Sequence, residues 1–154
     1  MPRKSKLPIC KAIQELNKEK NTHIEYTIIG DYYGRKKEFD RFKFVTYYEN
    51  LPHDKVLQEM REANLYIQNS QFETFGLAVM EAVLQGTSLL MSKNIGAKEV
   101  FSNLNQNDII YETNNIEEIK SKIWKCLEDN NAERLYEGIK FNEIDTKVTG
   151  KVYY

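Results

Sequence analysis

Glu73 and Glu81, with seven residues between them, form a candidate ligand-binding pair in this chain of 154 residues. The segment between them follows a short apolar run, Leu65–Gln68, and opens an apolar run of helical character, Thr74–Gln85. A strand followed by a helix puts their junction at the carboxyl end of the strand, where open α/β sheets bind their ligands. We therefore expect both carboxylates at the ligand-binding edge of a sheet, Glu73 in the loop and Glu81 one turn beyond Leu77.

The residue types between the two glutamates indicate what such a ligand contains. Gly76, near the start of the predicted helix, lets a ligand approach the backbone closely, and the free amides of a helix N-terminus suit a phosphate group. The carboxylates do not suit phosphates, but an ionised carboxylate accepts two hydroxyl donors at once. The pattern predicts a ligand with a phosphate part and a polyol part, such as a ribose or a sugar.

The rest of the chain alternates between strand and helix periodicity, which is typical of βαβ units and a parallel sheet with helices on both faces. Asn114 or Asn115 is expected to cap one of the helices. The predicted strands are Ile24–Ile29, Phe42–Tyr47, Leu65–Gln68, Thr87–Ser92 and Asp108–Tyr111, and the predicted helices are Leu7–Lys20, one opened by Pro52, Thr74–Gln85, Lys98–Phe101, one following Asn114 or Asn115, and Ala132–Val152.

Composition narrows the class of protein. The chain has the length of one domain, with 41% hydrophobic residues, and its 22 basic and 23 acidic residues give a net charge of −1. A balanced charge gives no reason to expect nucleic acid as a partner. No apolar run is long enough to span a membrane, and Cys10 and Cys126 lack metal or disulfide spacing. We expect a cytoplasmic single domain, residues 1–154.

Other chemistries lack their residues. The sequence contains no glycine pattern of a dinucleotide fold or a phosphate-binding P-loop. It has no Asp-x-Asp pair, and neither histidine has a companion at ligand spacing, so we expect no metal and no cofactor.

The segment resembles the retaining, nucleotide-sugar-dependent glycosyltransferases of the GT-B fold, which carry two glutamates with this spacing around Phe75-Gly76-Leu77. The large group with capsule and lipopolysaccharide enzymes is the nearest match. The flanks are also similar: Tyr26–Asp31, Asn64–Ile67, Gln85–Leu89 and Gly96–Glu99. The resemblance implies a Rossmann-like, donor-binding domain, the C-terminal half of such an enzyme.

The resemblance also implies roles for individual residues. Glu81 would bind the ribose hydroxyls of a UDP- or GDP-sugar, and Glu73 would lie beside the donor sugar as the candidate catalytic residue. Thr74 and the backbone amides of Phe75, Gly76 and Leu77 would hold the diphosphate or the sugar. Lys4 fits the family's diphosphate lysine.

Two parts of the family pattern have no counterpart here. The family places an arginine on the diphosphate from the strand before the first helix, and Arg3 beside Lys4 is not a convincing replacement. The acceptor-binding N-terminal domain and that first strand are not in the sequence. The resemblance therefore implies that this chain binds the donor but, alone, transfers the sugar poorly. The acceptor would be a glycan or a lipid-linked acceptor, and the pathway would be surface polysaccharide synthesis.

Two alternatives remain open at this stage. The first alternative to a catalytic donor domain is a non-catalytic nucleotide-binding module, which includes one half of a split enzyme. The second alternative is a sugar-nucleotide 2-epimerase, which shares the architecture but fits the Phe-Gly-Leu segment less well. We expect His53 and four tyrosines near the ligand-binding cleft, with a surface histidine and core-capping tyrosines as the simpler interpretation. The tyrosines are Tyr32, Tyr33, Tyr47 and Tyr48.

Overall fold

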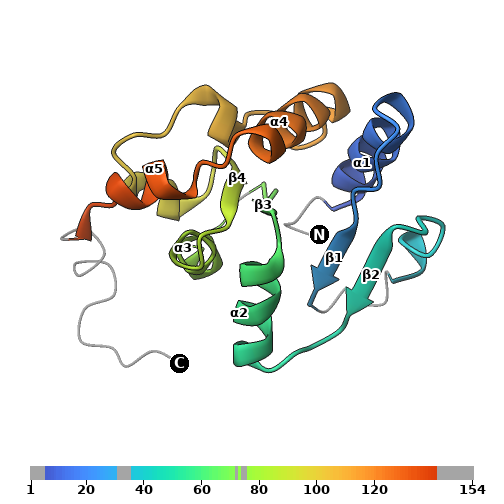
Figure 1. Ribbon diagram of the computed structural model, residues 1–154, viewed down its shortest axis with the longest axis horizontal. Coiled ribbons are helices and arrows are strands. Elements are labelled where there is room, and N and C mark those ends of the chain that lie inside the picture. Colours follow the sequence, from blue (N-terminus) through green and yellow to red (C-terminus); the bar gives the residue numbers. More distant parts are fainter. Residues whose placement is uncertain (1–5, 31–35, 72, 74–75, 142–154) are drawn as a thin grey trace.

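The protein is an α/β domain in which short strands alternate with helices, as the periodicity predicts (Figure 1). The computed structural model describes residues 6–30, 36–71, 73 and 76–141. The strands are β1 (Tyr26–Ile29), β2 (Val45–Tyr48), β3 (Leu65–Gln68), β4 (Ser88–Ser92) and β5 (Ile109–Ile110). The helices are α1 (Leu7–Glu19), α2 (His53–Glu62), α3 (Leu77–Leu84), α4 (Ile116–Glu128) and α5 (Ala132–Glu137), with short 3-10 turns η1 (Lys36–Glu38), η2 (Gly96–Val100) and η3 (Gln106–Asp108).

Local signals in the sequence place several boundaries correctly. The third strand has the predicted limits, and Asn115 caps α4 by accepting a hydrogen bond of 3.0 Å from the Glu118 amide. Pro52 precedes α2 as its N-cap residue. These signals succeed because capping and proline effects depend on only a few neighbouring residues.

Two predicted helices are wrong at one end. The helix expected from Thr74 begins only at Leu77, because Gly76 has a left-handed backbone (φ +84°) that a right-handed helix cannot contain. The helix expected over Ala132–Val152 ends at Glu137, and Ile139 forms an antiparallel bridge with Phe101 instead. Residues 142–154 of that prediction lie outside the described residues.

The strands form two parallel sheets rather than one. One sheet has the order β1–β2, with Tyr26 opposite Val45, and the other has the order β3–β4–β5, with Leu65 opposite Ser88. All five residues of β4 are buried, which is typical of a parallel strand paired on both sides.

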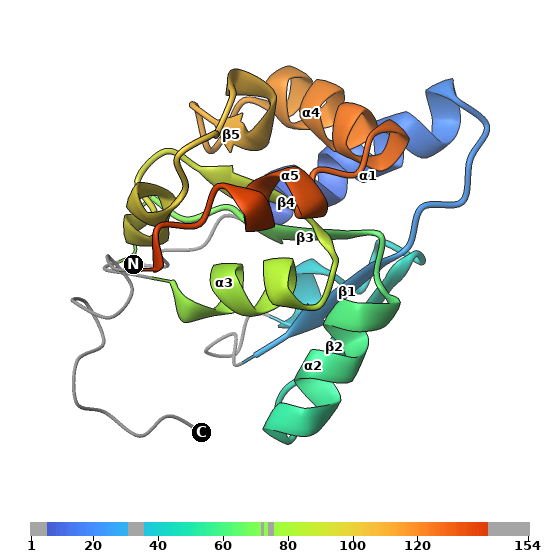
Figure 2. The same ribbon diagram turned by 60° about the vertical axis from the view of Figure 1, so that its left-hand side comes forward.

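Helices cover both faces of the sheets, as predicted. Helices α1 and α4 lie side by side on one face, whereas α2 and α3 lie on the other (Figures 1 and 2). The side chains of β4 divide between the two cores, Leu89 and Met91 packing with Val79 of α3 and Leu90 packing with Ile13 of α1. No described helix is long and apolar enough to cross a membrane.

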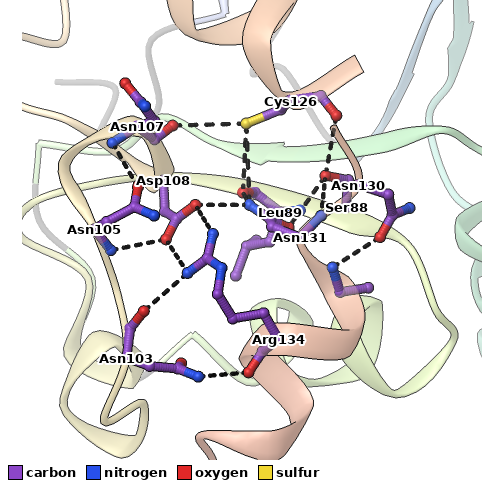
Figure 3. Close-up of polar contacts among 11 residues, drawn as sticks. Ser88, Leu89, Asn103, Asn105, Asn107, Asp108, Cys126, Asn130, Asn131 and Arg134 are labelled. Atoms are coloured by element: carbon purple, nitrogen blue, oxygen red, sulfur yellow. Dashed lines mark hydrogen bonds and ion pairs between the residues drawn. The ribbon is translucent and has the colours of Figure 1, made fainter. Parts of the chain in front are cut away.

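A buried polar cluster attaches α5 to the edge of β4 (Figure 3). The Asn131 side chain accepts from the Leu89 amide at 2.8 Å and donates to the Leu89 carbonyl at 2.8 Å. It therefore pairs with β4 as a neighbouring strand would. Asn131 Nδ2 also donates to Asp108 at 2.9 Å, and Arg134 reaches the same carboxylate with two nitrogens at 2.9 and 3.0 Å.

We expect Asn131→Leu to lower the free energy of unfolding by about 2–4 kcal/mol, because buried groups of Leu89 and Asp108 lose their partners. Urea unfolding followed by circular dichroism measures the change. Asn107→Ala is the matched control, since this exposed side chain lies in the neighbouring turn and its cluster contacts use the backbone. Equal losses in the two variants would contradict a structural role for the Asn131 amide.

Candidate functional site

The backbone of Glu73 is fixed where β3 and β4 diverge. Its amide donates to the Asn94 carbonyl at 3.2 Å, and its carbonyl accepts from the Gly96 amide at 3.0 Å. These bonds form an isolated parallel bridge between Glu73 and Ile95. Glu73 is half-buried, so its carboxylate starts from a rigid main chain yet remains accessible at the carboxyl edge of the sheet.

The strand ends beneath this position are joined by short-range polar contacts. Ser92 Oγ accepts from the Ser70 amide at 2.9 Å and donates to the Ser70 carbonyl at 2.6 Å. Gln68 Nε2 donates to Ser70 Oγ at 2.9 Å. Because Ser70 and Ser92 are completely buried, these bonds hold the edges of β3 and β4 together just before the site.

Gly76 allows the chain to turn from Glu73 into α3. Its φ of +84° is a left-handed conformation that only glycine adopts at little cost. A Cβ at this position would also lie 3.0 Å from Cγ2 of Ile95 and 3.6 Å from Cγ of Glu73. Both the backbone conformation and the lack of space therefore require glycine here.

The first turn of α3 presents backbone donors at the same edge. Leu77 and Ala78 occupy the first two helical positions, where an amide has no carbonyl partner one turn earlier within the helix. Both residues are only half-buried. Such amides, together with the helix dipole, favour an anionic group.

Glu81 lies one helical turn beyond Leu77, on the same side of α3, and pairs with a residue from another helix. Its Oε2 is 2.9 Å from Nε2 of His53, the first residue of α2. Burial raises the pKa of the Glu81 carboxyl above its ordinary value, and the charge of His53 acts in the opposite direction. The carboxylate, whose side chain is 16% exposed, is thus partly removed from water and held by one partner.

The sequence analysis expects His53 near the ligand-binding edge, with a surface histidine as the simpler interpretation. Its side chain is 43% exposed, which agrees with the surface interpretation, but it also contacts Glu81. The two residues are 28 positions apart, and nothing in their spacing signals the contact.

Tyr66 of β3 connects the two glutamates electrostatically. Burial raises the pKa of its hydroxyl above the ordinary value, and the charges of Glu73 and Glu81 raise it further. Its hydroxyl donates to Gln68 Oε1. Both carboxylates therefore act on one buried hydroxyl, which keeps its proton at neutral pH.

The tyrosines at the end of β2 have different environments. Tyr47 donates its hydroxyl to the Gly30 carbonyl at 2.8 Å, so it ties the end of β1 to β2. Tyr48 is 38% exposed, and both tyrosines line an open hollow of about 460 Å³ with Glu49 and Asn50. Of these two tyrosines, Tyr48 has the exposed ring that a base or sugar would need.

Three predicted site residues, Lys4, Thr74 and Phe75, lie outside the described residues, as do Tyr32 and Tyr33. The described part brings Glu73, Gly76, Leu77 and Glu81 to one edge of the β3–β4–β5 sheet, whereas Glu99 is exposed on η2. Over the described ranges, no three His, Cys, Asp or Glu side chains are grouped to hold a metal ion.

A comparison with protein families gives one match, over residues 3–140, to the family described as glycosyl transferases group 1. Among curated proteins no sequence matches.

Solved structures share the fold at low sequence identity. HepE of Anabaena, in complex with UDP and glucose, has a TM-score of 0.72 at 18% identity, over 96% of this chain and 44% of its own. A trehalose-6-phosphate synthase, studied for glycosyl transfer with retention, has a TM-score of 0.70 at 14% identity, over 96% and 39%. Sucrose-phosphate synthase of Thermosynechococcus elongatus has a TM-score of 0.67 at 18% identity, over 94% and 40%. The chain thus spans about two fifths of the length of these structures.

We expect Gly76→Ala to destabilise the domain more than Gly86→Ala. Both glycines are left-handed, at φ +84° and +82°, so each alanine costs about 1–2 kcal/mol in backbone strain. Only at Gly76 does the added methyl group meet a neighbour, Ile95, since nothing lies within 4 Å at Gly86. Urea unfolding of both variants measures the difference, and equal losses would show that Ile95 moves aside freely.

We expect Glu81→Gln to stabilise the domain at neutral pH. A raised pKa means that the fold favours the protonated carboxyl, so this contribution is full below the ordinary value of about 4.3 and is lost as the pH rises through the higher folded value. The variant should therefore unfold at a higher temperature than the wild type at pH 7.5 and at a similar one near pH 4. Glu99→Gln, at an exposed position, is the control. A less stable variant at pH 7.5 would show that the His53 contact outweighs the cost of burial.

Proposed function

The chain belongs to the group 1 glycosyltransferases, and we propose that it is a donor-binding domain for a nucleotide-diphosphate sugar. The observation that carries this proposal is the arrangement at the start of α3, where Gly76, the first helical amides and the half-buried Glu81 share one sheet edge with Glu73. Donors for a diphosphate and acceptors for hydroxyl groups are what such a ligand needs.

Glu81 is proposed to bind the ribose of the nucleotide. An ionised carboxylate accepts both hydroxyls of a ribose, and a partly desolvated one gains more from each bond than one in water. His53 holds the Glu81 carboxylate at 2.9 Å and thereby orients it toward the ligand. The exposed ring of Tyr48 offers a surface for the base or the sugar.

Glu73 is proposed to act on the sugar. Because its main chain is fixed on both sides by bonds to Asn94 and Gly96, its carboxylate can orient sugar hydroxyls and shield positive charge at the anomeric carbon. In this proposal Leu77 and the backbone of Gly76, with Thr74, Phe75 and Lys4, hold the diphosphate as the bond to the sugar breaks. Preorganised amides of this kind stabilise the charge on a leaving group.

The wider reaction follows from the same proposal. The glycosyl group would pass to a glycan or lipid-linked acceptor with retained configuration and without a metal, since amides and lysine supply the charge. The UDP and glucose bound to HepE, and the retention studied in trehalose-6-phosphate synthase, support this choice of chemistry. In this proposal the acceptor binds to polypeptide other than these residues. The reaction is proposed to serve surface polysaccharide synthesis and to take place in the cytoplasm.

Thermal unfolding with nucleotides tests donor binding. We expect one of UDP, GDP or ADP, or its sugar, to stabilise the chain by about 2.7 kcal/mol at 100 times its dissociation constant. For a domain of this size that is a shift of roughly 5–10 °C. Glu81→Ala should lose the shift, and Glu128→Ala, which removes an exposed carboxylate from α4, should keep it. Equal shifts in the two variants would contradict the role of Glu81.

A further inference from the structure

In the described part of the chain, β2 is the last strand of its sheet. It pairs with β1 alone, from Val45 opposite Tyr26 to Tyr48 opposite Ile29. None of its four residues is buried, whereas all five residues of β4, which pairs on both sides, are buried. Figure 1 shows β2 on the far side of β1 from β3. We call the side of residues 43–49 that faces away from β1 the outer edge.

The backbone of β2 directs half of its hydrogen-bonding groups to the outer edge. The carbonyls of Phe44 and Tyr48 accept from amides of β1 and of the residue after it, at 3.0 and 2.9 Å. Since a strand alternates the side to which its N–H and C=O groups point, Val45, Tyr47 and Glu49 direct theirs away from β1. Such a row of main-chain groups is a template for pairing with another strand.

Two exposed charges of opposite sign flank the outer edge. Lys43 lies shortly before β2, and Glu49 follows its last residue. Over the described ranges neither side chain forms an ion pair. An antiparallel copy of the same strand brings the start of one edge beside the end of the other, so Lys43 lies opposite Glu49 at both ends. A parallel copy in register would instead place like charges opposite each other, which is unfavourable.

We propose that the outer edge pairs with the outer edge of a second copy of this chain, antiparallel and with Thr46 on the two-fold axis. Thr46 lies midway between Lys43 and Glu49, so it is opposite its own copy when both charge pairs form. The two β1–β2 sheets then become one continuous sheet. Because the contact is the same surface on both copies, it closes at two chains.

The backbone and the other side chains agree with this register. Val45 lies opposite Tyr47 of the other copy, and both direct their main-chain groups to the outer edge, as a hydrogen-bonded antiparallel pair requires. The Val45 amide donates to the Phe42 carbonyl at 3.1 Å, so each such pair gains the bond from the Tyr47 amide to the Val45 carbonyl. Pairs of aromatic and β-branched side chains stabilise neighbouring strands.

A neighbouring register is less favourable. A shift by one residue would place groups that point to the outer edge opposite groups that point to β1, and it would also separate Lys43 from Glu49. The charges and the direction of the backbone groups therefore select the same register independently.

The outer edge is short, so we expect a weak and reversible dimer. Four strand residues are few beside the interfaces of stable dimers, which bury about 1,200–2,000 Å² in total. Sedimentation velocity from about 10 to about 500 μM chain should therefore show a shift from monomer toward dimer. A chain that remains monomeric throughout this range would overturn the proposal.

Thr46→Cys tests the position of the two-fold axis. Residues directly opposite each other between hydrogen-bonded pairs have Cα atoms about 4.5 Å apart, within the range of about 4.4–6.8 Å that a disulfide spans. Under mild oxidation the variant should form a covalent dimer, seen by non-reducing electrophoresis. Thr27→Cys is the matched control, because Thr27 is also exposed and lies opposite Thr46 in β1. Both native cysteines are buried.

The control also distinguishes the two sides of the β1–β2 sheet. Thr27 is one strand further from the outer edge in each copy, so Thr27→Cys should cross-link at least tenfold more slowly than Thr46→Cys. Equal or faster cross-linking through Thr27 would assign the contact to the opposite side of the sheet and would overturn the proposal.

Charge reversal tests the register. Lys43→Glu and Glu49→Lys each place like charges opposite each other at both ends of the paired edges, so each should weaken the dimer at least fivefold. The variant with both changes restores opposite charges and should return the dimer to the wild-type affinity. Lys125→Glu, at an exposed position of α4, is the control and should leave the affinity unchanged.

Failure of the double variant to restore the dimer, or single variants that dimerise like the wild type, would overturn the pairing of Lys43 with Glu49. Circular dichroism of each variant at low concentration checks that the monomer is folded. None of these readouts involves a nucleotide, so dimer formation and the proposed donor binding are tested independently.

Discussion

The structure depends above all on the pairing of buried backbone groups, and β4 shows this most completely. Every residue of β4 is buried, and it pairs with β3 on one side and with β5 on the other. Where β5 is too short to reach Leu89, the Asn131 side chain supplies one donor and one acceptor in its place. Asn131 thereby fixes the start of α5 and, through Asp108 and Arg134, the turn before β5.

The described strands form two sheets, and β1 and β3 line the cavity between them. In the described part of the chain each of these two strands pairs on one side only, and apolar side chains of α1, α2, α3 and α4 line the cavity. An unpaired edge lined by apolar side chains is unfavourable in water and prone to pair with other strands.

The candidate site combines a rigid backbone frame with one carboxylate, Glu81, whose burial disfavours its charged form. Glu73, Gly76 and the strand ends are fixed by backbone bonds and close packing, so they supply geometry. Glu81 is different, because its partial burial disfavours the charge that ligand binding would use. Stability given up at a binding residue is common where a site awaits a charged or hydrogen-bonding ligand. The His53 contact offsets part of that cost and connects α2 to the site.

The sequence by itself determined the order of strands and helices, the glutamate pair around Gly76 and the family. These features depend on local periodicity, on the capping of helices and on a motif within fourteen residues. All three involve residues close together in the sequence, so they can be recognised without the structure. The sequence did not place the start of α3, because nothing along the chain signals that Gly76 is left-handed or that it packs against Ile95, nineteen residues away. It also overextended the last helix, because the bridge between Ile139 and Phe101 competes with helical spacing. Only the tertiary structure decided that His53 contacts Glu81, that Asn131 pairs with β4 and that β1 and β3 line one cavity. Each of these joins residues distant in sequence, and packing of whole elements, rather than any local preference, brings them together.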